Sequence, residues 1–168
     1  MDEELFEKLV NTYEFMRPGK TLEEQKAEGL INDLYGAFHI CTGNGWYSIL
    51  NNWAREISEV YEKANIPCDV KIAQIKEKFG KLRIYLDFVG QEKHIHAFDF
   101  IGNGSIRFVS KDTPIHRKVA EITKKYEELS VTVCSECGND GELRKALPWM
   151  LTLCDECYLK RIKREIGD

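Results

Sequence analysis

The sequence predicts an α+β fold, in which helices pack a mostly antiparallel sheet of about four strands and a small cysteine-containing module follows. Three observations support this fold class. Apolar residues recur at helical spacing in three segments, alternating runs surround two glycine-containing turns, and four of the six cysteines lie within residues 134–157. We therefore divide the chain into an α+β domain, residues 1–130, and a C-terminal module, residues 131–168.

Three segments are expected to form the main helices. Apolar residues recur every three or four positions in residues 2–16, and Pro18 ends that helix. Residues 46–64 carry the longest helical pattern in the chain. The third helix, residues 114–129, begins with Pro114, because proline is favoured at the first helical position.

A short helix is expected to begin after Thr21. Its side chain can cap the helix, and Glu24 stands three residues later, where it completes a capping box. Residues 27–41 show no clear periodicity and receive no assignment.

Two β-hairpins follow from period-two alternation. The first, residues 69–89, turns at Gly80 and Lys81, and the second, residues 93–109, turns around residues 102–105. Together they supply the expected strands of the sheet. The candidates for one face of the first strand are Val70, Ile72 and Gln74.

Four cysteines form two Cys-x-x-Cys pairs with 16 residues between them, namely Cys134, Cys137, Cys154 and Cys157. That gap falls in the range of about 15–20 residues that is typical of paired zinc-binding motifs. Gly138 permits a tight turn after the first pair, and the second pair opens a helical stretch whose N-terminus favours thiolates. Two short strands between the pairs complete a pattern similar to a treble clef or zinc ribbon. Because four thiolates leave no open coordination position, we expect one structural Zn²⁺ that activates no water.

Alternatives to this zinc site stay open at the level of sequence. Two disulfides or redox pairs would use the same cysteines, although a reducing compartment disfavours disulfides. Iron also accepts four thiolates. His94 and His96 share one strand face and could hold a second metal, but they lack a third ligand, so solvated strand positions are the better interpretation. Cys41 and Cys68 are expected to be buried free thiols.

A basic hairpin is the main candidate for partner binding. Residues 70–83 carry a net charge of +4, which together with an aromatic tip suits a phosphate or a nucleic-acid strand. The alternative is a solvated face whose lysines protect a sheet edge. The module adds further candidates, although its net charge is −1. The candidate residues are Lys76, Lys78, Phe79, Lys81, Arg83, Arg144, Lys145 and Trp149.

Composition and motifs restrict the function further. The net charge of −4 argues against general coating of nucleic acid. No apolar run is long enough to cross a membrane and the N-terminus is acidic, so we expect a cytoplasmic protein without a membrane partner. No Ser/His/Asp order, metalloprotease motif or phosphate loop is evident, and we predict that the protein is not an enzyme. The segment GNGWY, residues 43–47, is expected to be an ordinary helix start rather than an anion site.

Four separated blocks together resemble a group of small proteins that phages and prophages encode. The blocks are GNGWYSIL, QIKEKFGKLRIY, SVTVCSECGNDGELR and WMLTLCDEC. The resemblance implies a phage accessory protein with zinc at the four cysteines, working in the bacterial host cytoplasm, and it implies no activity.

Two function hypotheses follow. The first is a non-catalytic, zinc-stabilised binding protein, such as a counter-defence factor, that engages a host protein or a nucleotide-like anion. The second is a nucleic-acid-binding regulator that uses hairpin 70–83 and the zinc module. The sequence leaves open whether the chain forms a homo-oligomer.

Overall fold

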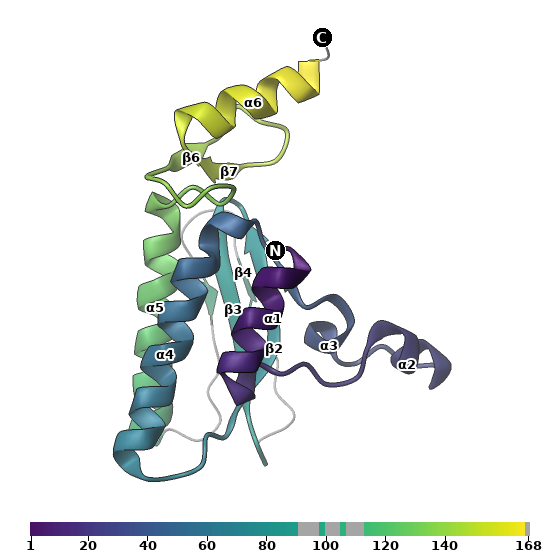
Figure 1. The fold of residues 1–168 in the computed structure, drawn as a ribbon, viewed down its shortest axis with the longest axis vertical. Coiled ribbons are helices and arrows are strands. Elements are labelled where there is room, and N and C mark those ends of the chain that lie inside the picture. Colours follow the sequence, from purple (N-terminus) through teal and green to yellow (C-terminus); the bar gives the residue numbers. More distant parts are fainter. Residues whose placement is uncertain (91–97, 100–104, 107–112, 167–168) are drawn as a thin grey trace.

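The structure, a computed structural model, describes residues 1–90, 98–99, 105–106 and 113–166 and has a mixed α+β architecture (Figure 1). The helices are α1 (Glu3–Thr12), α2 (Leu22–Ala27), α3 (Leu34–Phe38), α4 (Tyr47–Ala64), α5 (Pro114–Leu129) and α6 (Asp155–Ile166). The strands are β1 (Ile40–Cys41), β2 (Val70–Lys78), β3 (Lys81–Phe88), β4 (Phe98–Asp99), β5 (Ser105–Ile106), β6 (Glu142–Arg144) and β7 (Leu151–Leu153). Single 3₁₀ turns cover Glu14–Met16, Asn44–Trp46 and Ser130–Thr132.

The two long helices confirm the helical periodicity of the sequence. Helices α4 and α5 run side by side along the sheet (Figure 1). Helix α4 buries residues at three- and four-residue spacing and ends at Asn65, whose left-handed conformation is a common way to close a helix. Helix α5 starts as predicted, because the Thr113 side chain accepts a hydrogen bond from the His116 N–H at 3.1 Å and Pro114 takes the first position.

The first helix is shorter than predicted. Helix α1 ends at Thr12 because Tyr13 is extended, and residues 14–16 form a separate 3₁₀ turn. The Tyr13 hydroxyl donates to α4 at the Asn51 carbonyl oxygen over 3.2 Å, and the turn then buries Met16 completely. Contacts with α4 and the core therefore decide where this helix stops.

The first predicted hairpin is confirmed, with two corrections to its detail. The turn is formed by Phe79 and Gly80, which both have left-handed φ angles of 55° and 76° and thus match the twist of a two-residue hairpin turn. A β-bulge between Ile72 and Gln74 shifts the alternation by one residue. Ile75, rather than Gln74, is therefore the next fully buried residue of β2.

The main sheet has three strands in the order β1-β2-β3, and its third strand comes from the segment that the sequence left unassigned. Strand β1 pairs parallel to β2, with Ile40 opposite Ile75. Strands β4 and β5 pair antiparallel inside the second predicted hairpin, but among the described residues they form a sheet of their own. The predicted four-stranded sheet is therefore not confirmed. The remaining positions of residues 93–109, including His94 and His96, lie outside the described residues.

The described residues form two hydrophobic clusters. The larger one joins α1, α4, α5 and the sheet, and its largest fully buried side chains are Trp46 and Trp53. The smaller one lies in the C-terminal module and consists of Cys134, Leu147, Leu151 and Leu153. The module thus has a small core of its own, and the domain boundary at residue 130 stays a prediction.

The outer edge of β3 is covered by polar side chains from α5 and the turn that follows it. The Leu82 N–H donates to Ser130 Oγ at 2.9 Å, and the Ile84 N–H donates to Glu127 Oε1 at 2.7 Å. Both acceptors are buried, Ser130 completely. These bonds satisfy edge N–H groups that would otherwise be available for pairing with another strand.

A buried hydroxyl joins α4 to α5 and gives a first testable prediction. The indole N–H of Trp53 donates to Thr123 Oγ1 at 3.1 Å, and that hydroxyl donates to the Val119 carbonyl oxygen at 2.8 Å. We expect Thr123→Val to lower the free energy of unfolding by about 1–3 kcal/mol, because it leaves the buried indole N–H without an acceptor. Urea unfolding measures this as a lower midpoint with an unchanged slope. The exposed Thr12→Val should change stability by less than about 0.5 kcal/mol, and an equal effect of both would contradict this assignment.

Candidate metal centre

Two local structures bring the four cysteines of the module together. The first pair lies in a tight turn, in which the Gly138 N–H donates to the Cys134 carbonyl oxygen at 2.9 Å and Gly138 adopts a left-handed φ of 85°. The second pair lies at the start of α6, with Cys154 directly before the helix and Cys157 in its first turn. Strands β6 and β7 form the predicted hairpin between the pairs.

The four sulfur atoms form a compact cluster that fits one tetrahedral metal ion. The Sγ atoms of Cys134, Cys137, Cys154 and Cys157 all lie within 4.8 Å of one another, and none forms a disulfide. Cys137 Sγ and Cys154 Sγ are 3.7 Å apart. Four thiolates at about 2.3 Å from a tetrahedral zinc ion are separated by about 3.8 Å, so this spacing matches. The structure therefore provides a four-cysteine group that could hold a metal ion.

Backbone donors prepare part of this cluster for negative charge. Burial alone raises the pKa of the Cys134 thiol, but N–H groups of Cys154, Cys137 and Glu136 outweigh it and lower the pKa to about 7. Burial and the neighbouring thiols raise the pKa of Cys157 instead. Four thiolates this close together repel one another, and a divalent cation is the group that would relieve this repulsion.

Arg144 ties the hairpin to the helix that carries the second cysteine pair. Its guanidinium donates to the Leu153 carbonyl oxygen at 3.2 Å and to Asp155 Oδ1 at 2.5 Å. It also lies over the ring of Tyr158 at 4.7 Å from the centroid. The side chain is only 15% exposed, so Arg144 acts inside the module, whereas Lys145 next to it is exposed.

The GNGW segment forms the first contact between the module and the rest of the protein. The Gly45 N–H donates to the Ser135 carbonyl oxygen at 2.9 Å, and the Trp46 indole N–H donates to the Val133 carbonyl oxygen at 2.8 Å. A Cβ atom on Gly45 would lie 2.1 Å from the Cys134 carbonyl oxygen, so only glycine allows this approach. The GNGW segment thus packs directly against the turn that carries the first cysteine pair. From sequence, this segment was predicted only to start a helix.

The tip of the β2–β3 hairpin forms the second contact. Thr152 Oγ1 donates to the Gly80 carbonyl oxygen at 2.6 Å, and the Trp149 indole N–H donates to Glu77 Oε2 at 2.6 Å. A Cβ atom on Gly80 would lie 2.2 Å from Leu143 Cδ1. Glu77 and Thr152 were not identified from the sequence, because only the tertiary structure brings Glu77 to Trp149 and Thr152 to Gly80.

The predicted basic residues gather on one face of the hairpin, as the strand register shows. Lys76 is opposite Arg83, and Lys78 is opposite Lys81, so their side chains leave the same side of the sheet. The three lysines and Phe79 are half-buried. Arg83 departs from the expectation of an exposed binding residue, because it is only 5% exposed and lies 4.0 Å from the Glu127 carboxylate.

Of the remaining predicted residues, Trp149 is exposed as a binding residue should be, whereas the two free cysteines are more exposed than expected. Trp149 is 55% exposed although its N–H is bonded. Cys41 and Cys68 were predicted to be buried, and both are exposed. Cys41 ends the short edge strand β1, and Cys68 lies in the loop between α4 and β2, so neither position reaches the core.

Comparison with known proteins adds no relative. No family model matches the chain, and no curated protein or solved structure shows significant similarity to it. Within the described part of the chain, no helix combines the length and the apolar character that crossing a bilayer requires.

Proposed function

We propose that this protein is a non-catalytic binding protein whose C-terminal module folds around one structural Zn²⁺ ion. The observation that carries the proposal is the cluster of four cysteine sulfurs within 4.8 Å of one another. Such a set saturates tetrahedral zinc and leaves no coordination position for substrate or water, which favours a structural role over catalysis. The order of tight turn, hairpin and helix is the arrangement of a treble clef.

For the binding partner, we keep the classes that the sequence suggested, a host protein or a nucleotide-like anion. We infer an accessory protein of phage origin that acts in the bacterial cytoplasm, for example against a host defence, by engaging a host protein or a nucleotide-like anion. The basic face of the β2–β3 hairpin supports this assignment, because it carries the half-buried side chains of Lys76, Lys78 and Lys81. The second candidate, a nucleic-acid-binding regulator, would use the same face.

Metal analysis tests the zinc assignment. We expect about one zinc ion per chain in freshly purified protein by elemental analysis. Replacement of zinc by Co²⁺ should give the intense visible absorption of a tetrahedral cobalt ion together with sulfur-to-cobalt charge-transfer bands. Protein without stoichiometric metal, or with the four sulfurs oxidised in the native cell, would refute the proposal.

Charge reversal on the hairpin separates the two candidate functions. We expect the triple variant Lys76→Glu, Lys78→Glu and Lys81→Glu to lose the host protein that the wild-type chain captures, because it reverses the charge of the basic face. Binding of a short single-stranded oligonucleotide, measured by fluorescence anisotropy, should be absent for both proteins.

Two further results decide between the candidates. Oligonucleotide binding that falls steeply with salt and disappears in the triple variant would favour the regulator instead. The charge reversal Lys63→Glu with Lys124→Glu, at two exposed lysines of α4 and α5, serves as the control. Unchanged capture by the hairpin variant would contradict the role of this face.

A further inference from the structure

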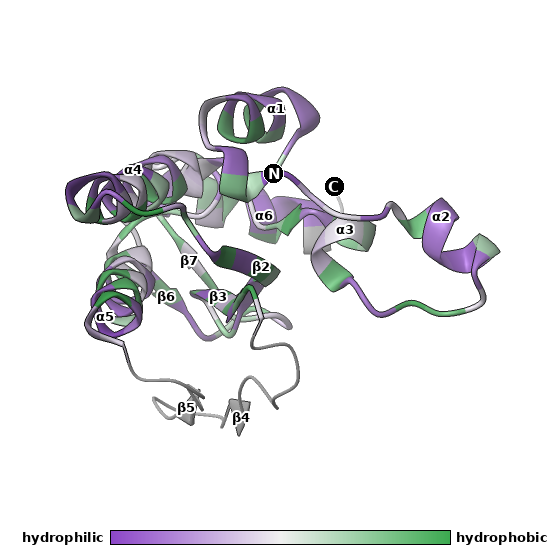
Figure 2. Ribbon diagram, turned by 90° about the horizontal axis from the view of Figure 1, so that it is seen from below, coloured by the Kyte–Doolittle hydropathy of each residue, from purple (hydrophilic) through white to green (hydrophobic). Residues whose placement is uncertain are grey.

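Residues 20–38 form an arm that extends away from the rest of the molecule. It consists of α2, the link through residues 28–33, and α3, and both views show it leaving the body at the side opposite α4 and α5 (Figures 1 and 2). One side of α3 is attached to the body, because Tyr35 is buried and its hydroxyl donates to the Met16 carbonyl oxygen at 2.8 Å. The arm thus has one attached side and one side that points to solvent.

The solvent side of the arm carries four large apolar side chains within nine residues. Leu34 and Phe38 are 42% and 49% exposed, and their four-residue spacing places them one above the other on α3. Leu30 and Ile31, in the link, are 62% and 45% exposed. Figure 2 shows the apolar colour in the middle of this link, between hydrophilic ends. Single exposed apolar residues are common on soluble proteins, but a concentration of this kind indicates a binding surface.

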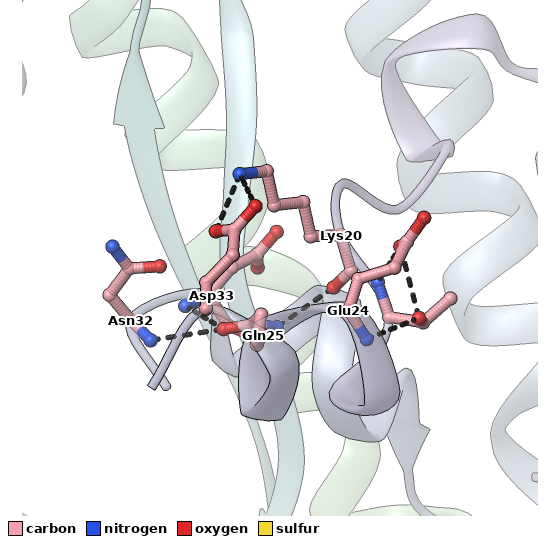
Figure 3. Close-up of polar contacts among 7 residues, drawn as sticks. Lys20, Glu24, Gln25, Asn32 and Asp33 are labelled. Atoms are coloured by element: carbon pink, nitrogen blue, oxygen red, sulfur yellow. Dashed lines mark hydrogen bonds and ion pairs between the residues drawn. The ribbon is translucent and has the colours of Figure 1, made fainter. Parts of the chain in front are cut away.

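Polar contacts, rather than a hydrophobic core, hold the arm in shape (Figure 3). Gln25 is completely buried, and its amide nitrogen donates to the carbonyl oxygens of Lys20 and Asp33, each at 2.8 Å. Its amide oxygen accepts from the N–H groups of Asn32 at 3.0 Å and Asp33 at 2.8 Å. One side chain therefore ties the C-terminal end of the link, Asn32 and Asp33, to α2 and to Lys20 at the start of the arm.

Two further contacts complete this frame. Thr21 and Glu24 form the predicted capping box, with the Thr21 N–H donating to Glu24 Oε2 at 2.7 Å. Lys20 and Glu28 form an ion pair at 2.5 Å across the base of α2. An apolar surface that is fixed in advance loses little conformational entropy when a partner binds.

Charge identifies the chemistry of that partner. The arm, residues 20–38, contains four acidic and two basic residues, and residues 1–39 together carry a net charge of −5, whereas the remaining 129 residues carry +1. An apolar surface in an acidic region attracts a segment that combines apolar and basic residues. It repels nucleic acid, and a second copy of the chain would bring two acidic arms together.

We propose that the arm is a docking site for an amphipathic helix of another protein, whose apolar face covers Leu30, Ile31, Leu34 and Phe38 and whose flanks carry lysine or arginine. A helix laid on a preformed apolar surface is a recurrent mode of peptide recognition. The arm contains none of the basic residues of the hairpin and no cysteine of the metal cluster. The docking site therefore goes beyond the proposed function and can fail or succeed independently of it.

A designed peptide tests the docking site with the full-length, metal-loaded protein. The probe is a fluorescent helical peptide of about 18 residues, about five turns, with leucine on one face and lysine on the other. We expect it to bind with an affinity that decreases as salt increases, and we expect no measurable binding of the matching peptide of leucine and glutamate. Equal binding of both peptides would overturn the proposal.

Three variants locate the binding. Leu34→Ser with Phe38→Ser should weaken binding of the leucine–lysine peptide at least about tenfold, because two apolar contacts are lost. Ile66→Ser, a similarly exposed apolar residue outside the arm, should leave the affinity unchanged. Gln25→Ala keeps the apolar residues but removes the four bonds that fix the link, and it should weaken binding as well. Wild-type affinity in the double serine variant would overturn the proposal.

Analytical ultracentrifugation tests whether a second copy of this chain, rather than a helix of another protein, covers the apolar side of the arm. We expect the wild-type chain to remain monomeric at concentrations where the peptide binds. A dimer that dissociates in the Leu34→Ser, Phe38→Ser variant would overturn the proposal in favour of self-association. Because these side chains are exposed, circular dichroism of the variant should match the wild type.

Discussion

Replacement of Cys134 by serine is expected to abolish stoichiometric metal binding and to unfold the C-terminal module. Cys134 is the fully buried member of the cluster, and serine supplies no thiolate for zinc. The module has only a small hydrophobic cluster, so metal coordination contributes much of its folding free energy. With free metal at about 1,000 times the dissociation constant, binding stabilises the folded state by about 4 kcal/mol. Because this loss falls on the module, its thermal transition should move to a lower temperature than in the wild type, while the transition of the body is retained.

The loss should be confined to the module at first. The larger hydrophobic cluster is built from the helices and sheet of the body, so α4 and α5 should remain folded while α6 loses its helical signal in circular dichroism. Treatment of the wild type with a strong chelator should reproduce this result. The exposed Cys68→Ser serves as control and should retain metal and midpoint. Unchanged metal content in the Cys134 variant would contradict the four-cysteine site.

The elements that sequence predicted well are those with long periodic patterns and local capping signals. Helix α5 covers the predicted residues 114–129, because its stripe of buried residues, its cap and its proline all act locally. The metal cluster also followed from sequence, since Cys-x-x-Cys spacing and Gly138 together specify the turn. The identity of the metal is not fixed by this spacing and stays part of the proposal.

Features that depend on distant contacts were not visible in the sequence. Strand β1 has only two residues, too few for any alternation, and it exists because it pairs with β2. The bulge between Ile72 and Gln74 changes which side chains face the core, and no local signal marked it. Arg83 belongs to a basic run, yet its position beside Glu127 makes it a buried ion-pair partner.

The glycine motifs illustrate this difference most clearly. GNGW and the glycine of the hairpin tip each allow a turn in isolation, which is all that the sequence could indicate. In the folded chain both lie against the cysteine module, where Gly45 approaches the backbone of Cys134 and Gly80 approaches Leu143. All four blocks that suggested a resemblance therefore meet where the module contacts the body, since Trp149 and Thr152 of the last block also bond to the hairpin tip. These blocks therefore share one structural role, which is to form the contact between the cysteine module and the rest of the protein.

Replacement of Gly45 by alanine is expected to weaken both the module's attachment and its metal affinity. The added methyl group would lie 2.1 Å from the Cys134 carbonyl oxygen and 2.8 Å from the Cys137 backbone nitrogen. These are backbone atoms of the cysteine turn and cannot rotate away, so we expect destabilisation of about 3 kcal/mol or more. If the clash distorts the metal-binding conformation of the cysteine turn at a cost of about 1.4 kcal/mol, the metal affinity decreases tenfold.

Competition with a chromophoric chelator measures the metal affinity of this variant, and thermal unfolding measures its stability. Gly90→Ala is the matched control, because Gly90 has a left-handed φ of 80° and no atom of the described residues lies within 4 Å of an added Cβ. It should cost about 1–2 kcal/mol through backbone strain alone and leave metal affinity unchanged. If Gly45→Ala behaved like this control, the contact of the GNGW segment with the cysteine turn would not support metal binding. A decrease in metal affinity only for Gly45→Ala would show that the body of the protein and its metal centre are energetically coupled through this contact.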